Sequence, residues 1–138
     1  WNEFECGSNY ARSMASYALL NAFSGFQFDM VRQKIGFRPV RLIDGCFRCF
    51  WSLDSGWGEF ELAPDRAEVR LLYGHLDLRE LTLALAEGQS VAAVQVNATP
   101  IPFTTTAETL RLSSGVHLTA GSRITAIFAW CRIRPPFR

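Results

Sequence analysis

The chain has 138 residues and a formal net charge of +1, with 49% hydrophobic and 20% charged residues. Its length suits one ordinary domain, and its composition is typical of a globular protein with no extensive disordered segment. The basic residues are scattered, which argues against a nucleic-acid partner. No apolar run approaches the roughly 20 residues of a membrane-spanning helix, so we expect no membrane span.

The first residue is Trp1, and neither an initiator methionine nor a signal-like segment stands before the first structural pattern. We therefore expect the numbering to begin inside a longer polypeptide.

The first predicted element is a helix over residues 8–24, with Ser8 or Asn9 as its N-cap and Gly25 as its left-handed stop. One stripe of this helix carries only small residues: Ala11, Ala15, Ala18 and Ala22. Small side chains permit close packing against another helix. The rest of the chain offers no obvious helical partner.

After Gly25 the helical period does not return, and short strands or turns follow. From Cys46 onward the alternation and turn signals predict eight strands, at residues 46–53, 57–62, 67–73, 75–85, 91–97, 108–113, 115–119 and 123–131. The leucine pattern changes phase across Arg79 and Glu80, which predicts a β-bulge. The predicted fold class is α+β, with an N-terminal helix followed by an antiparallel, jelly-roll-like β-sandwich over residues 41–138.

The four cysteines are too few for a disulfide scaffold, and their pairing stays open: Cys6, Cys46, Cys49 and Cys131. Cys46 and Cys49 form a C-x-x-C pair. On a strand an offset of three places the two sulfurs on opposite faces, and no second pair follows. We expect no metal site here.

Two acidic residues, Glu3 and Glu5, precede the helix, and Arg12 lies in its first turns. A cation near the positive end of the helix dipole costs ~0.3 to 1 kcal/mol, so Arg12 needs a nearby anion or a function. Two interpretations remain open. Arg12 pairs with one of the carboxylates at a surface, or Arg and Glu together bind the hydroxyl groups of a sugar.

The segment over residues 2–17, NEFECGSNYARSMASY, resembles glycoside hydrolase family 116, the family of bile-acid and non-lysosomal glucosylceramide β-glucosidases. Four later segments add to this resemblance, which covers roughly residues 1 to 85: Phe23–Phe26, Ile35–Pro39, Phe47–Trp51 with Gly56–Gly58, and Tyr73–Gly74.

This resemblance implies that residues 1–40 are the terminal helix and connection of an (α/α)6 catalytic barrel. It implies that Glu3 and Arg12 contact glucose hydroxyls in the −1 subsite of a retaining β-glycosidase. The Glu nucleophile and Asp acid/base of the family lie upstream of this motif. Retaining chemistry needs two carboxyl groups about 5 Å apart, so the chain alone is expected to be inactive. The implied partners are a β-glycoside substrate and the upstream barrel, and no cofactor is implied.

Other residues carry weaker signals. Glu59 and Glu61 share a strand face with Trp57, and the pattern favours outward glutamates on a half-buried sheet over an acid pair. His75 and His117 each stand alone, and we expect them to be structural or exposed.

Three tryptophans, Trp51, Trp57 and Trp130, are candidates for a sugar-stacking platform, although the core is their expected place. Two further functional hypotheses remain open as alternatives to the glycosidase hypothesis. The sandwich is a non-catalytic carbohydrate-binding module, or it is a structural domain that caps the barrel. The sequence does not indicate a cellular compartment, nor the sugar and aglycone bound.

Overall fold

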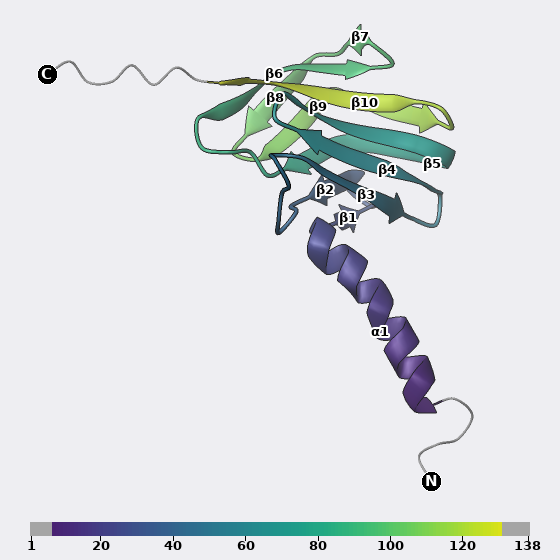
Figure 1. Cartoon of the computed structure of the whole chain (residues 1–138). Helices are drawn as coiled ribbons and strands as arrows, with labels where there is room; N and C mark the ends of the chain where they lie inside the picture. The colour runs from purple at the N-terminus through teal and green to yellow at the C-terminus, as the bar shows by residue number, and fades with distance from the viewer. Residues whose placement is uncertain (1–6, 131–138) are drawn as a thin grey trace, which may run out of the picture.

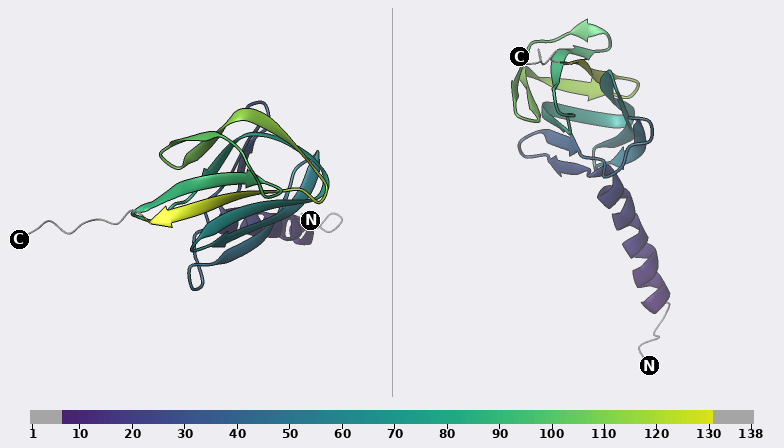
Figure 2. Two further views of the ribbon diagram at one scale, coloured as in Figure 1. Left: turned by 90° about the horizontal axis from the view of Figure 1, so that it is seen from above. Right: turned by 60° about the vertical axis from the view of Figure 1, so that its left-hand side comes forward.

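The computed structural model describes the backbone of residues 7–130 and the side chains of residues 16–130. Helix α1 (Gly7–Ser24) leads into two packed β layers and projects away from them, as Figure 1 and the right-hand view of Figure 2 show. The predicted helix over residues 8–24 is confirmed, and Gly25 adopts the expected left-handed conformation, with φ of 59°.

The remaining elements are all strands: β1 (Gln27–Asp29), β2 (Lys34–Phe37), β3 (Phe47–Ser52), β4 (Gly56–Ala63), β5 (Arg66–Leu83), β6 (Gln89–Val96), β7 (Thr99–Pro100), β8 (Phe103–Thr106), β9 (Thr109–Thr119) and β10 (Arg123–Trp130). The predicted combination of one helix with a β-rich domain is therefore confirmed. Two pairs of predicted strands are continuous, because residues 67–73 and 75–85 join within β5 and residues 108–113 and 115–119 join within β9. Strands β7 and β8 were not predicted.

Strand β5 belongs to both layers of the sandwich. Its first part pairs with β4 and β10, which gives a sheet in the order β3-β4-β5-β10-β6-β7. Its second part pairs with β2 and β9, which gives the order β1-β2-β5-β9-β8. The β2–β5 pair is parallel and the other pairs are antiparallel. The register of β5 against β9 shifts between Leu78 and Glu80, which confirms the predicted bulge.

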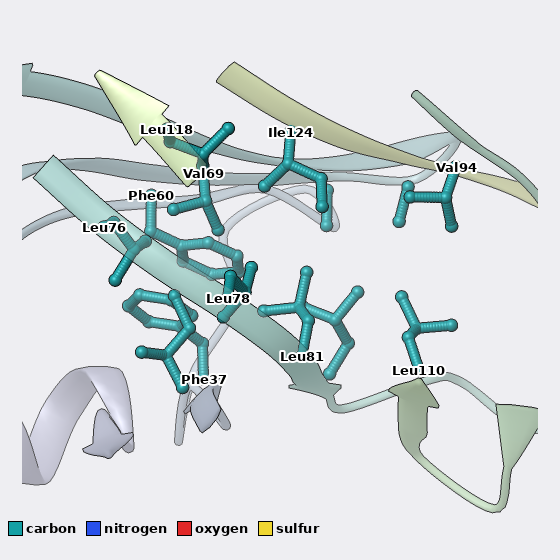
Figure 3. Close-up of a cluster of buried hydrophobic side chains, with 14 of the residues drawn as sticks. Phe37, Phe60, Val69, Leu76, Leu78, Leu81, Val94, Leu110, Leu118 and Ile124 are labelled. Atoms are coloured by element: carbon teal, nitrogen blue, oxygen red, sulfur yellow. The ribbon is translucent and has the colours of Figure 1, made fainter. Parts of the chain in front are cut away.

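The core lies between the two sheets and is built from the inward residues of each strand (Figure 3). Phe37 from β2 and Phe60 from β4 stack with ring centroids 3.9 Å apart and an interplanar angle of 2°. Leu76 and Leu78 of β5 are fully buried, as period-2 alternation requires. Clusters of this kind supply most of the free energy that holds a sandwich together.

The C-terminal end of α1 is fixed to the sandwich by the segment that follows β2. The backbone N–H of Arg38 donates to the carbonyl of Ser24 (3.0 Å), and the N–H of Val40 donates to the carbonyl of Phe23 (3.1 Å). These bonds satisfy two carbonyl groups that a helix end otherwise leaves open. A Cβ atom on Gly25 would lie 2.1 Å from the carbonyl oxygen of Arg38, so only glycine fits this joint.

Among the described residues, no helix combines the length and the apolar character needed to cross a membrane.

Candidate functional site

Two regions of the molecule are candidates for function, helix α1 and the outward face of the sheet formed by β3, β4 and β5. Glu3 lies outside the residues that the structure describes. Arg12 lies on α1, five residues after the helix begins, and its side chain is outside the described part. Whether Glu3 and Arg12 share a site therefore remains a prediction.

The described part of α1 exposes apolar side chains. Every side chain from residue 16 to residue 23 is exposed. Four of them are large and apolar: Tyr17, Leu19, Leu20 and Phe23. Tyr17 has 77% of its surface accessible. A helix that presents large apolar groups to solvent over two turns is unusual for a surface helix, which places its apolar residues toward the core.

On the sandwich, one aromatic side chain from each of three neighbouring strands forms an exposed row. We call Phe50 (β3), Trp57 (β4) and Tyr73 (β5) the aromatic row. Their exposed fractions are 46%, 39% and 64%. The ring centroids of Phe50 and Trp57 are 5.8 Å apart, and those of Trp57 and Tyr73 are 6.0 Å apart with planes within 19°. The row is one continuous aromatic surface.

Strand register and two glycines place these rings side by side. Trp57 is paired with Tyr73, and the register then shifts between Trp57 and Gly58. A Cβ atom on Gly58 would lie 1.8 Å from the carbonyl oxygen of Arg70. Gly74, directly after Tyr73, has φ of +80°, where other residues are strained. The bulge therefore depends on glycine at these positions. The bulge in turn places Trp57 and Tyr73 opposite each other on the same face.

A group of alternating charges continues from the aromatic row along the same face. An Nη atom of Arg48 lies 2.7 Å from an oxygen of Glu59, and Arg70 lies 3.5 Å from Glu59 and 2.8 Å from Glu68. We call these four residues the charged network. A hydrogen bond and the charge of Glu59 raise the pKa of Arg48, so its guanidinium stays protonated. Two positive and two negative groups leave the network without net charge.

The prediction of outward glutamates on a half-buried sheet is confirmed. Glu59 and Glu61 lie on the outward side of β4, while Phe60 and Leu62 are buried. Glu59 is held by Arg48 and Arg70, and Glu61 lies 3.3 Å from Arg66. Each carboxylate thus has an arginine partner, which is not the arrangement of a catalytic acid pair.

The three tryptophans named from the sequence do not form a platform together. Trp51 is 1% exposed, so its predicted place in the core is confirmed. The same prediction is wrong for Trp57 and Trp130, which are exposed. Trp130 pairs with Gln89 at the end of β10, whereas Arg123, at the other end, pairs with Arg70 in β5. Trp130 is therefore remote along the sheet from the aromatic row.

Sequence reasoning missed Phe50 and Tyr73 as members of this surface. A signal was present for Phe50, because strand alternation places it on the face opposite to Trp51. No such signal existed for Tyr73, because Leu72 and Tyr73 are both exposed beside the bulge. Local pattern does not predict which residue a bulge turns outward.

The two histidines are exposed as expected, but the expectation that each stands alone is wrong. Asp77 and His117 are cross-strand partners in β5 and β9, and Nδ1 of His117 lies 2.7 Å from Oδ1 of Asp77. The rings of His75 and His117 stack with centroids 5.6 Å apart. Within the described residues, no group of three or more His, Cys, Asp and Glu is arranged to hold a metal ion.

Cys46 and Cys49 are free thiols in different surroundings. Cys46 is exposed, and Cys49 is partly buried in β3. Desolvation raises the pKa of Cys49 to about 11, although a hydrogen bond with Ser24 opposes this effect. Cys49 is therefore almost entirely protonated at neutral pH and poorly suited to act as a nucleophile.

A cavity of about 570 Å³ lies beside the β1–β2 turn, and its lining includes Arg32, Arg79 and Arg111. Each of these arginines has a partner within the chain. Arg32 pairs with Asp29, Arg79 donates to Gln33, and Arg111 lies 3.9 Å from Glu80. The cavity is open to solvent and none of its described lining residues is aromatic, so it has fewer features of a built site than the outward sheet face.

Comparison of the sequence with models of known protein families gives no match, and comparison with curated proteins gives none either.

Proposed function

We propose that this chain is the C-terminal part of a retaining β-glycosidase of the β-glucosidase type. The observation that carries the proposal is the segment over residues 2–17, with its resemblance to glycoside hydrolase family 116. On this proposal Glu3 and Arg12 bind hydroxyl groups of the sugar in the −1 subsite. A carboxylate accepts and a guanidinium donates, which suits a site that must reject sugars lacking a hydroxyl group.

The exposed apolar surface of α1 supports this proposal. A helix with Tyr17, Leu19 and Phe23 in solvent gains little from folding unless another element covers it. A neighbouring helix of an (α/α)6 barrel would cover it, and the small-residue stripe would permit close approach. Helix α1, up to Ser24, is then the last helix of the barrel. Strands β1 and β2, which carry the core residues Ile35 and Phe37, belong with the jelly-roll-like domain and not with a barrel connection that runs to residue 40.

The chemistry of this proposal belongs to the parent enzyme. The nucleophile and the acid/base are carboxyl groups upstream of residue 1, and Glu3 and Arg12 act by positioning the sugar and by bonds that strengthen in the transition state. Glu3 and Arg12 alone, without the rest of the −1 subsite, should bind a β-glucoside weakly at most, and the 138-residue chain should not hydrolyse it.

The proposal is tested in the parent enzyme with an aryl β-glucoside as substrate. We expect Glu3→Gln and Arg12→Ala each to lower kcat/KM by about a hundredfold or more, because each removes a charged hydrogen bond to the sugar. Arg12→Lys should recover part of the loss, since a lysine keeps the charge but not the planar fork.

Two exposed residues of the sandwich give matched controls. Glu87→Gln and Arg41→Ala make the same chemical changes at exposed positions and should leave kcat/KM within about twofold. Circular dichroism spectra of all variants establish that they fold. If folded Glu3→Gln and Arg12→Ala enzymes keep parental kinetics, the assigned roles of both residues are wrong. If the parent reading frame encodes no helical region upstream, the proposal as a whole fails.

A further inference from the structure

The aromatic row has no role in the function proposed above. Its three rings come from three consecutive strands and are all substantially exposed. Exposed aromatic side chains that touch one another on a protein surface mark places where another molecule binds, whereas scattered single ones do not. The exposure of Trp57 and Tyr73 to water therefore indicates that another molecule binds over them.

The position of the row in the fold indicates the shape of that occupant. The rings lie on the outward face of a sheet, and Phe50 belongs to β3, which is the edge strand of that sheet. Among the described strands, β3 pairs with β4 alone, so a ligand that crosses the rings can extend past the edge of the sheet. The ring planes of Phe50 and Trp57 differ by 41°, so the row suits an extended ligand whose successive units can tilt as it crosses neighbouring strands.

The charged network indicates the chemistry of the occupant. Phe50 is paired in register with Glu59, so the polar groups begin directly beside the rings. Arg48 and Arg70 offer donors, and Glu59 and Glu68 offer acceptors, with no net charge among the four. Proteins that stack the bases of single-stranded nucleic acid combine aromatic groups with a positive groove, and this face lacks that excess of positive charge.

A β-linked glucan chain matches all three properties. It is neutral, it is rich in hydroxyl groups that both donate and accept, and with β-1,4 linkages its pyranose rings form an extended ribbon. The C–H groups on the faces of those rings are weakly positive, and the faces of aromatic rings are negative. An α-1,4-linked glucan coils instead, and it would not extend across the three strands.

We propose that the aromatic row and the charged network bind a neutral β-1,4-linked glucan. The exposed parts of Trp57 and Tyr73 pack against the faces of sugar rings, and Phe50 extends the contact at the sheet edge. Glu59 accepts hydrogen bonds from sugar hydroxyls, while Arg48 and Arg70 donate to them. This inference does not depend on the proposed glycosidase, since it concerns a surface of the sandwich alone.

The test uses the 138-residue chain in native gel electrophoresis, with gels containing mixed-linkage β-glucan, hydroxyethyl cellulose, soluble starch or no polysaccharide. We expect the β-glucans to retard the chain and starch to leave its mobility unchanged. Trp57→Ala and Tyr73→Ala should each weaken binding by about tenfold or more. The loss of one stacked aromatic ring weakens the binding of nucleic-acid bases by about this factor, and we expect the same for a sugar ring. Tyr73→Phe keeps the ring and should keep the binding.

Trp130→Ala is the matched control, because it removes an exposed tryptophan at a remote part of the sandwich. It should retain β-glucan binding within about twofold. Circular dichroism melting curves show whether each variant is folded, and the two alanine variants should melt close to the parent chain because all the replaced rings are exposed.

Several results would overturn the proposal. They are an absence of retardation by either β-glucan, an equal loss in the Trp130→Ala chain, or stronger binding to starch. Binding of single-stranded DNA that is lost with Trp57→Ala would assign the row to nucleic acid instead. Destabilisation of the parent enzyme by Trp57→Ala, without any glucan binding, would make the row a contact with the barrel. Hydrolysis by the parent and its dependence on Glu3 are measured separately, so either proposal fails independently of the other.

Discussion

The sandwich buries large apolar residues in its core, whereas the described part of helix α1 exposes them. In the sandwich, Ile35, Leu76 and Leu78 have no accessible surface, and strand alternation directs polar residues outward. In α1, large apolar residues such as Tyr17 and Leu19 remain in solvent, and two backbone hydrogen bonds join the last turn to the segment after β2. The two regions thus differ in what stabilises them, although they are continuous in sequence and fixed at Gly25.

This difference separates residues that serve the folding of the chain from residues that serve an association. Burying one leucine side chain contributes about 1.5 to 3 kcal/mol. The sandwich gains this free energy within the chain, whereas the helix gains it only when a partner covers it. Substitutions in the two regions should therefore have effects of different size, and the size should depend on whether the partner is present.

The largest effect is expected in the core. Phe60→Ala removes a fully buried ring that stacks on Phe37, and it should lower the free energy of unfolding by about 3 to 5 kcal/mol. Urea denaturation followed by circular dichroism at strand wavelengths measures this loss. A loss under 1 kcal/mol would mean that the Phe37–Phe60 stack is not the centre of the core.

The next effect concerns the reactivity of the Cys49 thiol, which contacts Ser24 at the end of α1. A rise of the pKa of Cys49 from 9.0 to about 11 lowers its thiolate fraction at pH 8 about a hundredfold. Iodoacetamide should modify Cys49 much more slowly than the exposed Cys46, as mass spectrometry of the separate peptides would show. Equal rates at pH 8 would contradict the burial of Cys49.

The same pKa rise makes a prediction for stability at alkaline pH. Because the folded-state pKa lies above the unfolded-state value, the contribution of Cys49 is fully present below pH 9 and is lost as the pH rises toward 11. Cys49→Ser should remove this part of the pH dependence, and Cys46→Ser is the matched control. Tm values measured from pH 7 to pH 10.5 test this.

A smaller effect is expected at the joint itself. Gly25→Ala places a Cβ atom against the carbonyl of Arg38 in a left-handed conformation, and it should cost about 1 to 3 kcal/mol. We expect a loss of helical circular dichroism signal with the strand signal preserved. Gly121→Ala is the control, because that glycine also has positive φ but no neighbouring atom within 4 Å. Equal losses in the two variants would show that φ alone matters at Gly25.

The smallest effect is expected on α1 in the isolated chain. Leu19→Ala removes an exposed side chain and should change the free energy of unfolding by no more than about 0.5 kcal/mol. In the parent enzyme the same change should cost about 2 to 5 kcal/mol, if the barrel covers this residue. Identical effects in the two settings would mean that α1 has no partner in the parent.

Much of the fold was predictable because its signals are local. The helix limits follow from Gly25 and the residues that precede it, and the bulge in β5 follows from the change of phase at Arg79 and Glu80. Strand pairing was not predictable in the same way. The parallel pair of β2 with β5 joins residues 34–37 to residues 80–83, and nothing in either segment specifies the other.

The candidate sites show the same division. Outward Glu59 and buried Trp51 follow from alternation along one strand. The aromatic row depends on three strands, a register shift at Gly58 and a left-handed residue at Gly74, so it exists only in the folded sheet. The contact of His117 with Asp77 likewise arises from pairing across 40 residues. Glu3 and Arg12 were inferred from resemblance, and they remain predictions.

Strand β5 has a consequence for how the molecule unfolds. Because one 18-residue strand lies in the middle of both sheets, neither layer contains a complete set of neighbours without it. Loss of β5 from one layer removes the central support of the other. The sandwich should therefore melt as one calorimetric unit with equal calorimetric and van't Hoff enthalpies, and a cut within β5 should leave no fragment that folds.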